Sequence, residues 1–181
     1  PIAYMERTKN YYLGLGYDNP YQWSHFDDVP FCPPTIPLSD ARIAIVTTAA
    51  PFQPDKGNQG PGAGYNAAVK FYHVYKLPTD PEPDLRISHV AIDRTHTTAE
   101  DRGTYFPLTA LKKARTSQII KAISPFIYGF PTNRSQRTHI ERDCLDLVSE
   151  LKDDKIDAVI AVPNCPVCHQ SIALAARAIE S

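Results

Sequence analysis

The stretch DAVIAVPNCPVCHQSIALAARAIES (157–181) decides the fold class of this chain. Its first part, DAVIAVP (157–163), is an apolar run without polar alternation, which is typical of a strand buried on both faces of a parallel sheet. In its second part, Ile172, Ala176 and Ile179 recur at helical spacing, so a helix follows the strand directly. A strand that leads straight into a helix predicts an α/β protein, and two cysteines lie at the junction.

Other segments extend this alternation. RIAIVTTAA (42–50), LRISHVAID (85–93) and FIYGFP (126–131) predict three more strands. Helices are predicted from Thr109 to Arg115 and over 132–152. In the longer helix one face carries Ile140, Cys144, Leu147, Val148 and Leu151. The pattern predicts a Rossmann-like, open and mainly parallel sheet with helices on both faces. Four strands are few for this class, so we expect a further C-terminal strand beyond Ser181.

Residues 1–40 differ in composition from the rest. Tyrosines, Trp23 and two phenylalanines are interleaved there with prolines at positions 20, 30, 33, 34 and 37. Closely spaced prolines prevent long regular elements. We therefore expect an extended N-terminal arm over residues 1–40, lying on the chain's own domain or on a partner, and a single α/β domain over residues 41–181.

The overall composition excludes several classes of protein. The chain has 181 residues, a formal net charge of −1 and 43% apolar residues, as expected for one globular domain. It lacks the basic face that binding to nucleic acid or an acidic membrane would need. It has no apolar run of about 18 residues and no signal-peptide pattern. Four cysteines are too few for a disulfide scaffold, so we expect a cytoplasmic protein.

The cysteine pair carries the sharpest chemical signal. Cys168 falls in the first turn of the predicted final helix, and Cys165 lies just before it. The N–H groups and partial positive charge of a helix N-terminus stabilise a thiolate and make it nucleophilic near neutral pH. The spacing also lets the second thiol attack an adduct on the first. We predict a redox dithiol without a bound cofactor, in which Cys165 is the nucleophile, Cys168 the resolving thiol and His169 a proton donor or thiolate partner.

Other interpretations of CPVCH stay open. Cys165, Cys168 and a histidine could hold zinc, although a structural zinc site needs four ligands and there is no second CxxC. The letters also match the attachment motif of c-type haem, but Met5 is the only methionine available as an axial ligand. The two thiols could be inert and buried. A racemase-like mechanism would need a second cysteine after the first strand, and none is present.

Polar residues also follow the other predicted strands, at the sheet edge where open α/β proteins bind ligands. Thr47 follows the first strand, Asp93 and His96 belong to DRTHTTAED (93–101), and Arg134 belongs to PTNRSQ (131–136). We expect these four side chains to bind substrate, with helix capping or solvation as the alternative. The Gly- and Pro-rich segment 53–66 lacks GxGxxG spacing and is interpreted as a loop.

Four segments together resemble a known family. They are RIAIVTTAA (42–50), SHVAIDRTHTTAEDRGTYFPL (88–108), GFPTNRSQRT (129–138) and DAVIAVPNCPVCHQS (157–171). They are similar to the glycine/sarcosine/betaine/D-proline reductase selenoprotein B family, and most of all to its short, D-proline-reductase-like members. In selenium-containing relatives selenocysteine occupies the first position of the cysteine block, so the resemblance places Cys165 there, with Cys168 and His169 at the positions that follow.

The resemblance implies an activity and partners. It implies reductive cleavage of a carbon–heteroatom bond in a small amino-acid-like substrate, with attack by the residue at position 165 and resolution by Cys168. An external dithiol would restore the pair. A partner subunit with a pyruvoyl group would activate the substrate amine, so a homo- or hetero-oligomer is expected.

Overall fold

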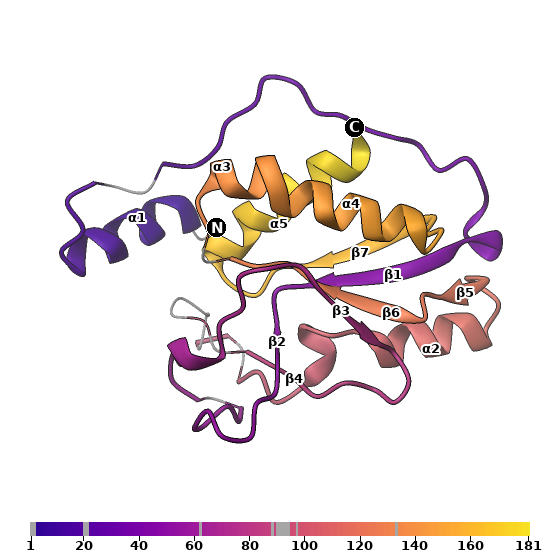
Figure 1. Cartoon of the computed structure of the whole chain (residues 1–181), viewed down its shortest axis with the longest axis horizontal. Helices are drawn as coiled ribbons and strands as arrows, with labels where there is room; N and C mark the ends of the chain where they lie inside the picture. Colours follow the sequence, from indigo (N-terminus) through magenta and orange to yellow (C-terminus); the bar gives the residue numbers. More distant parts are fainter. Residues whose placement is uncertain are drawn as a thin grey trace.

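The computed structural model describes residues 3–19, 22–61, 63–87, 89, 95, 96, 98–132 and 134–181. A five-stranded sheet forms the centre of the fold, with helices above and below it in Figure 1. Strand β1 (Arg42–Thr47) is central and pairs in parallel with β7 (Ala158–Val162) along one edge. Its other edge takes two short parallel partners, β5 (Ala122–Ile123) and β6 (Phe126–Gly129). The predicted mixed α/β architecture with a mainly parallel sheet is confirmed.

The apolar run of β1 explains its central place. Its four residues from Ile43 to Val46 are at most 4% exposed, because one set of side chains faces each layer of helices. Ile43 and Ile45 pack with Leu108 and Leu111 on one side of the sheet. Ala44 and Val46 pack on the other side with residues of helices α4 and α5. The sheet is therefore covered on both faces along β1, as predicted. Strand β7 is only partly buried and its Ile160 is 38% exposed, so the burial on both faces that was predicted for residues 157–163 is wrong.

Strand β3 (Tyr75–Pro78) was not expected from the sequence. It pairs antiparallel with β6 and closes that edge of the sheet. Pro78 has no N–H to donate, which suits a residue at the end of an edge strand. The edge position is thus filled by a short strand that the alternation of strands and helices did not predict.

The strand predicted over residues 85–93 needs a correction. Leu85–Arg86 form β4, which pairs antiparallel with β2 (Ala50–Pro51) in a separate two-stranded sheet, so a place in the parallel sheet is wrong for these residues. Leu85 is completely buried beneath the main sheet, and this burial explains its apolar sequence signal. Residues 88 and 90–93 lie outside the described residues.

Helices α4 (Cys144–Asp153) and α5 (Pro166–Glu180) cover one face of the sheet, and α2 (Leu108–Thr116) covers the other (Figure 1). The helix predicted over 132–152 is divided into α3 (Gln136–Thr138), a π-helical turn (His139–Asp143) and α4. Among the described residues, short 3₁₀ turns span Leu38–Asp40, Ala67–Val69 and Arg102–Thr104. The wider π turn changes the register, so Ile140 is 47% exposed and its predicted burial is wrong.

The N-terminal arm is only partly extended. Residues Tyr4–Gly14 form helix α1, because the closely spaced prolines begin only at Pro20. Residues 22–37 form neither helix nor strand, and in Figure 1 they pass over the helical layer. The guanidinium of Arg177 on α5 binds Asp28 at 2.7 Å and lies 4.1 Å from the centre of the Phe26 ring. This part of the arm therefore lies against the final helix of the chain's own domain.

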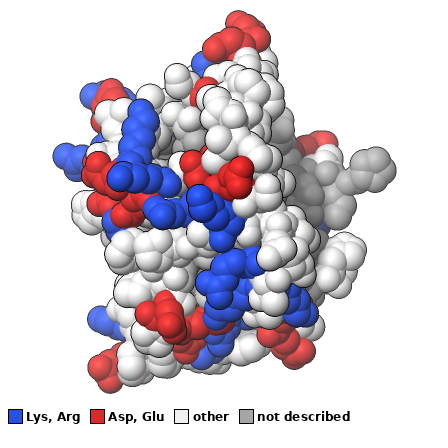
Figure 2. Space-filling view, turned by 90° about the vertical axis from the view of Figure 1, so that its right-hand side faces the viewer, with Lys and Arg blue, Asp and Glu red and all other residues white. Residues whose placement is uncertain are grey.

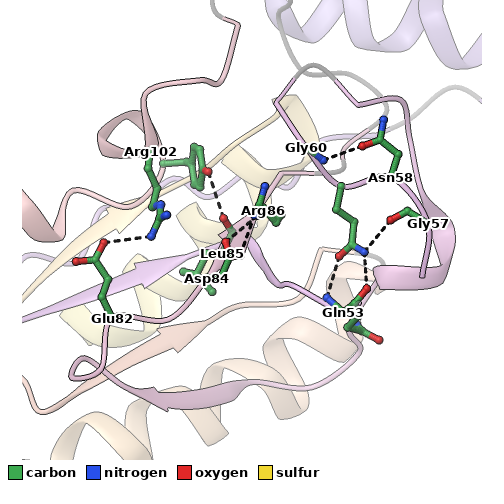
Figure 3. A network of polar contacts seen from close by, with 11 residues as sticks. Gln53, Gly57, Asn58, Gly60, Glu82, Asp84, Leu85, Arg86 and Arg102 are labelled. Atoms are coloured by element: carbon green, nitrogen blue, oxygen red, sulfur yellow. Dashed lines mark hydrogen bonds and ion pairs between the residues drawn. The ribbon is translucent and has the colours of Figure 1, made fainter. Parts of the chain in front are cut away.

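Polar side chains organise the loops below the sheet (Figure 3). The side chain of Gln59 is bonded to both backbone polar groups of Gln53, at 3.0 and 2.6 Å, and closes the predicted loop 53–66. Arg86 forms a two-point ion pair with Asp84, and Arg102 pairs with Glu82. These contacts hold the loops next to β4 and to the 3₁₀ turn Arg102–Thr104.

Charges of both signs are mixed on the surface that Figure 2 shows. On the face in Figure 2, basic and acidic side chains are interleaved and no large patch has a single sign. Within the described ranges, no helix is both long and apolar enough to cross a bilayer.

Candidate functional site

The site lies where β1 and β7 end side by side. Thr47 and Val162 pair at the carboxyl ends of these strands. The next residue, Thr48, donates its N–H to the carbonyl of Val162 at 3.3 Å, and its Oγ1 accepts the N–H of Asn164 at 3.1 Å. Two hydrogen bonds thus attach the turn after β7 to the end of β1. They fix the start of helix α5 at the carboxyl edge of the sheet, where ligands bind in open α/β proteins.

Cys165 is the N-cap of α5. Its backbone is extended, and its Sγ accepts the N–H of Cys168 at 3.3 Å. Pro166 occupies the first helical position, where its missing N–H is not needed and its fixed φ favours the helix. The CxxC spacing therefore has a local structural cause, because it places the third helical N–H on the cap sulfur. Both cysteines lie where the sequence pattern predicted.

His89 is the residue that the sequence analysis did not single out. Its Nδ1 lies 3.6 Å from Sγ of Cys168, and its Nε2 lies 3.0 Å from the carbonyl oxygen of Thr48. One ligand atom from each of His89, Cys165 and Cys168 lies within 4.8 Å of the other two. The only sequence signal was a histidine inside the otherwise apolar run LRISHVAID.

The two sulfurs have opposite electrostatic environments. Burial alone would raise the pKa of Cys168, but a hydrogen bond with Cys165 and the charge of His89 lower that pKa well below its usual value. The hydrogen bond to Cys168, together with burial, raises the pKa of Cys165. Burial works to lower the pKa of His89, yet the neighbouring sulfur of Cys168 raises it. The surroundings of the pair therefore favour ionisation of Cys168 over ionisation of Cys165.

The other predicted site residues are distributed differently. Thr47 is completely buried, and its Oγ1 donates to the carbonyl of Tyr105 and accepts the N–H of Ala49, so its hydroxyl serves the fold. Arg134 donates to the carbonyl of Tyr72 at 2.7 Å. Asp93 lies outside the described residues. His96 is exposed and does not belong to the three-residue cluster.

His169 lies beside the pair rather than within it. Its Nδ1 donates to the carbonyl of Cys165 at 2.7 Å, so this ring nitrogen supports the first turn of α5. The ring also lines a cavity of about 850 Å³ between α5 and the arm, together with Trp23, Phe26 and Pro166. On the other side of the site, a much smaller cavity of about 20 Å³ is lined by Thr48, Lys70 and His89. His169 is thus placed between the cysteine turn and the larger cavity.

A buried hydrogen-bonded chain supports α5 one turn further on. Ser171 Oγ lies 3.2 Å from His139 Nε2, and His139 Nδ1 donates to Asp143 at 2.9 Å. The order serine, histidine, aspartate is that of a hydrolytic triad. All three residues are at most 2% exposed, however, and His139 and Asp143 belong to the π turn. The hydrogen-bonded chain therefore joins α5 to the π turn inside the core.

Three comparisons with known proteins bear on the class of this site. The family described as glycine/sarcosine/betaine reductase selenoprotein B matches residues 12–163. D-proline reductase subunit gamma of Acetoanaerobium sticklandii is 28% identical over 162 residues, which cover 84% of this chain and 63% of that relative. Glycine reductase complex component B subunit gamma of Symbiobacterium thermophilum is 25% identical over 169 residues, which cover 92% of this chain and 38% of that relative. No solved structure matches.

The fold and the site define an α/β protein with a buried cysteine pair at a helix N-terminus. The chain belongs to the glycine/sarcosine/betaine reductase selenoprotein B family, since the matched range covers most of its length. This confirms the family that the sequence motifs suggested. The chain spans about two thirds or less of the length of these curated relatives, and the family match ends two residues before Cys165.

Proposed function

We propose that this chain is a thiol-dependent oxidoreductase of an amino-acid reductase complex, and that Cys165 and Cys168 cleave a carbon–heteroatom bond reductively. The observation that carries the proposal is the meeting of two thiols and an imidazole at the N-terminus of α5, at the carboxyl edge of the sheet. The relatives named above are subunits of D-proline and glycine reductases, which supports a role in the reduction of a small amino-acid-like substrate.

The proposed reaction uses the pair as a two-electron donor. Cys165 attacks the substrate carbon through its sulfur and gives its proton to the departing heteroatom. A carbon–sulfur bond forms while the carbon–heteroatom bond breaks, and the electron pair of the broken bond leaves with the heteroatom. The thiolate of Cys168 then attacks Sγ of Cys165. The disulfide forms, the carbon–sulfur bond breaks, and the carbon takes the electron pair and a proton. In total, two thiols become a disulfide, and the substrate gains two electrons and two protons.

The proposed partners follow from this balance. An external dithiol must reduce the disulfide after each turnover. When the carbon–sulfur bond breaks, the substrate carbon takes up negative charge, and this charge must be delocalised. A pyruvoyl group on a partner subunit, once joined to the substrate amine, would delocalise it. Hence we propose a hetero-oligomer as the working form. All four cysteines are free thiols in the structure, and a cytoplasmic location remains our expectation.

Trapping of the adduct tests the proposal. The reduced chain is mixed with candidate amino acids and a partner preparation, then quenched, digested and analysed by mass spectrometry. We expect the substrate-derived mass on Cys165, its accumulation in Cys168→Ser, and its loss in Cys165→Ser. Cys32→Ser is the matched control, because Cys32 is exposed and lies outside the cluster. An adduct that persists in Cys165→Ser, or equal labelling of all four cysteines, would contradict the proposal.

A second candidate function is a zinc-binding subunit. The distance of 3.6 Å between His89 Nδ1 and Cys168 Sγ equals the separation of about 3.6 Å expected for sulfur and nitrogen ligands on a tetrahedral zinc ion. The bond of His89 Nε2 to the Thr48 carbonyl is also the support that a metal-binding histidine commonly has. Metal analysis separates the candidates. Stoichiometric zinc that is lost in both His89→Ala and Cys165→Ser would favour this function, and purified protein without zinc would exclude it.

A further inference from the structure

We propose that His89 is a catalytic residue that accepts the proton of Cys168 and keeps the resolving thiol ionised inside the protein. The inference rests on the proposed function, because it assigns the base for its second step. It concerns a residue that the CPVCH motif does not contain, supplied by the segment that follows β4.

The hydrogen bonds of the ring define its tautomer. The Thr48 carbonyl can only accept, so Nε2 of His89, at 3.0 Å, must carry a hydrogen. In the neutral ring Nδ1 then has a lone pair and is the nitrogen able to accept a proton. The sulfur of Cys168 lies beside the ring, 3.6 Å from Nδ1 and 3.9 Å from Nε2. The carbonyl that follows β1 thus holds the imidazole against the thiol. Proton transfer from sulfur to Nδ1 leaves a charged ring next to the thiolate, with Nε2 still bonded to Thr48.

Cys168 needs such a partner because its sulfur is fully enclosed. The residue is 0% exposed, and an isolated buried thiolate would be unstable. The N–H of Cys168 at the helix N-terminus does not stabilise a thiolate on Cys168, since it is directed at Sγ of Cys165. The helical N–H therefore acts on Cys165, whereas the thiolate of Cys168 depends on the imidazole together with its contacts to Cys165 and Thr48.

The groups that act on His89 are few among the residues that the structure describes. Burial and the charge of Lys70, which lines the same small cavity, oppose protonation of the ring, whereas the sulfur of Cys168 favours it. The Thr48 carbonyl also favours the protonated ring, because a hydrogen bond from a charged donor is stronger than one from a neutral donor. The balance of these groups holds one proton on the ring while Cys168 is a thiolate.

Before the adduct is resolved, the S–H bond of Cys168 has broken and its proton lies on Nδ1 of His89. The electron pair that remains on sulfur then forms the bond to Sγ of Cys165, and the carbon–sulfur bond of the adduct breaks. The proton on Nδ1 is available to the carbon that takes the released pair, which returns His89 to its neutral form. Reduction of the disulfide by the external dithiol restores both thiols, so the proton balance closes.

A titration of the Cys168 thiolate tests the inference directly. In the full chain with Cys32→Ser and Cys165→Ser, Cys168 is the thiol that ionises in the accessible range, because burial raises the pKa of Cys144 to about 12. Serine at position 165 keeps a hydroxyl near Cys168. We expect the ultraviolet absorbance of the thiolate to appear below the ordinary thiol value of about 8.5. Adding His89→Gln should raise the midpoint by about 2 pH units or more.

The control is His73→Gln, which replaces an exposed histidine and should leave the midpoint unchanged. An equal midpoint with and without His89 would overturn the inference. In case the substituted chain does not fold, nitrogen-15 NMR of the unsubstituted protein gives a second test. The His89 ring should stay protonated above its ordinary pKa of about 6.5 in the reduced protein and lose this shift in the disulfide form. Titration near 6.5 in both redox states would also overturn it.

The failures of this inference and of the proposed function are distinguishable. With an intact cysteine pair, His89→Gln should still form the adduct on Cys165 but should convert it to the disulfide at least about tenfold more slowly at neutral pH, as expected when a general base is lost. An unchanged rate of disulfide formation would contradict the role of His89 and leave the proposed function intact. If no adduct forms in the unsubstituted chain, the proposed function itself is wrong, whatever the titration shows.

Discussion

Replacement of Thr48 by valine is expected to weaken both the fold and the ionisation of Cys168. The hydroxyl of Thr48 accepts the N–H of Asn164 at 3.1 Å, and it also helps to lower the pKa of Cys168. Valine has nearly the same shape but has no oxygen. The backbone bonds of Thr48 to Val162 and to His89 are retained, so the substitution removes only the contacts of the hydroxyl.

The magnitude can be worked out from these contacts. An N–H left without an acceptor inside the protein costs about 1–3 kcal/mol. The bond to Asn164 is only partly buried, so we expect Thr48→Val to lower the free energy of unfolding by about 1–2 kcal/mol through this contact. A second contribution depends on pH. The low pKa of Cys168 in the folded state stabilises the protein above the unfolded thiol value of about 8.5, and this stability is lost as pH falls through the folded pKa. Each pKa unit removed by valine adds about 1.4 kcal/mol of destabilisation at high pH.

Urea unfolding of the reduced protein at about pH 6 and about pH 9 measures both contributions. The destabilisation by Thr48→Val should be larger at the higher pH. Thr48→Ser is the matched control, because it keeps the hydroxyl and removes only a methyl group, with an expected effect of about 1 kcal/mol or less that does not change with pH. Equal losses for valine and serine, or a valine effect that is the same at both pH values, would refute the reasoning.

Two further predictions concern the structure around the site. A Cβ added at Gly129 would lie 1.8 Å from Cε1 of Tyr75, so Gly129→Ala should lower the free energy of unfolding by about 2–4 kcal/mol. In a Tyr75→Ala background the same substitution should lower it by less than about 1 kcal/mol, because the ring that clashes is gone. Additive effects in this double-mutant cycle would contradict the packing argument. Burial lowers the pKa of His139 despite the neighbouring carboxylate of Asp143, so the stability that depends on this histidine is complete above its unfolded pKa of about 6.5 and is lost as pH falls through that value. His139→Gln should therefore show a shallower loss of stability between about pH 7 and pH 5, as measured by urea unfolding, and a parallel slope would count against this assignment.

The junction of β7 and α5 was predictable because its determinants are local. An apolar run long enough for one strand, a proline at the first helical position and a cap residue before it are all visible in the sequence. The central strand β1 was predictable for the same reason. Cys165 and Cys168 lie within this local pattern, so their neighbourhood at the helix N-terminus could be predicted without tertiary information.

His89 could not be predicted as a site residue because its role depends on contacts between distant segments. It meets Cys168 across 79 positions and Thr48 across 41 positions of the sequence. The apolar residues around it suggested a strand of the parallel sheet, although Leu85–Arg86 belong to a small separate sheet. Leu85 is completely buried, and burial beneath a sheet gives the same apolar signal as burial within one.

The remaining differences have similar physical causes. Helix α1 was not predicted, because the prolines at positions 20–37 indicated an extended conformation for residues 1–40. Prolines restrict only their own neighbours, so residues 4–14 are free to form a helix. The π turn at His139–Asp143 shifts the helical register, and a fixed spacing of apolar residues cannot show such a shift. It turns Ile140 outward and brings the two polar residues at its ends into the core.

The central claim is that Cys165 and Cys168 exchange two electrons as a pair. The most direct measurement is the mass of the peptide that contains both residues, after the reduced protein has been equilibrated with a series of dithiol and disulfide mixtures of known potential. We predict that this peptide loses two hydrogens in one reversible step, with an internal disulfide between the two cysteines, while Cys32 and Cys144 stay reduced. A peptide that keeps both thiols across the whole series, or that oxidises only through bonds to other cysteines, would contradict the account.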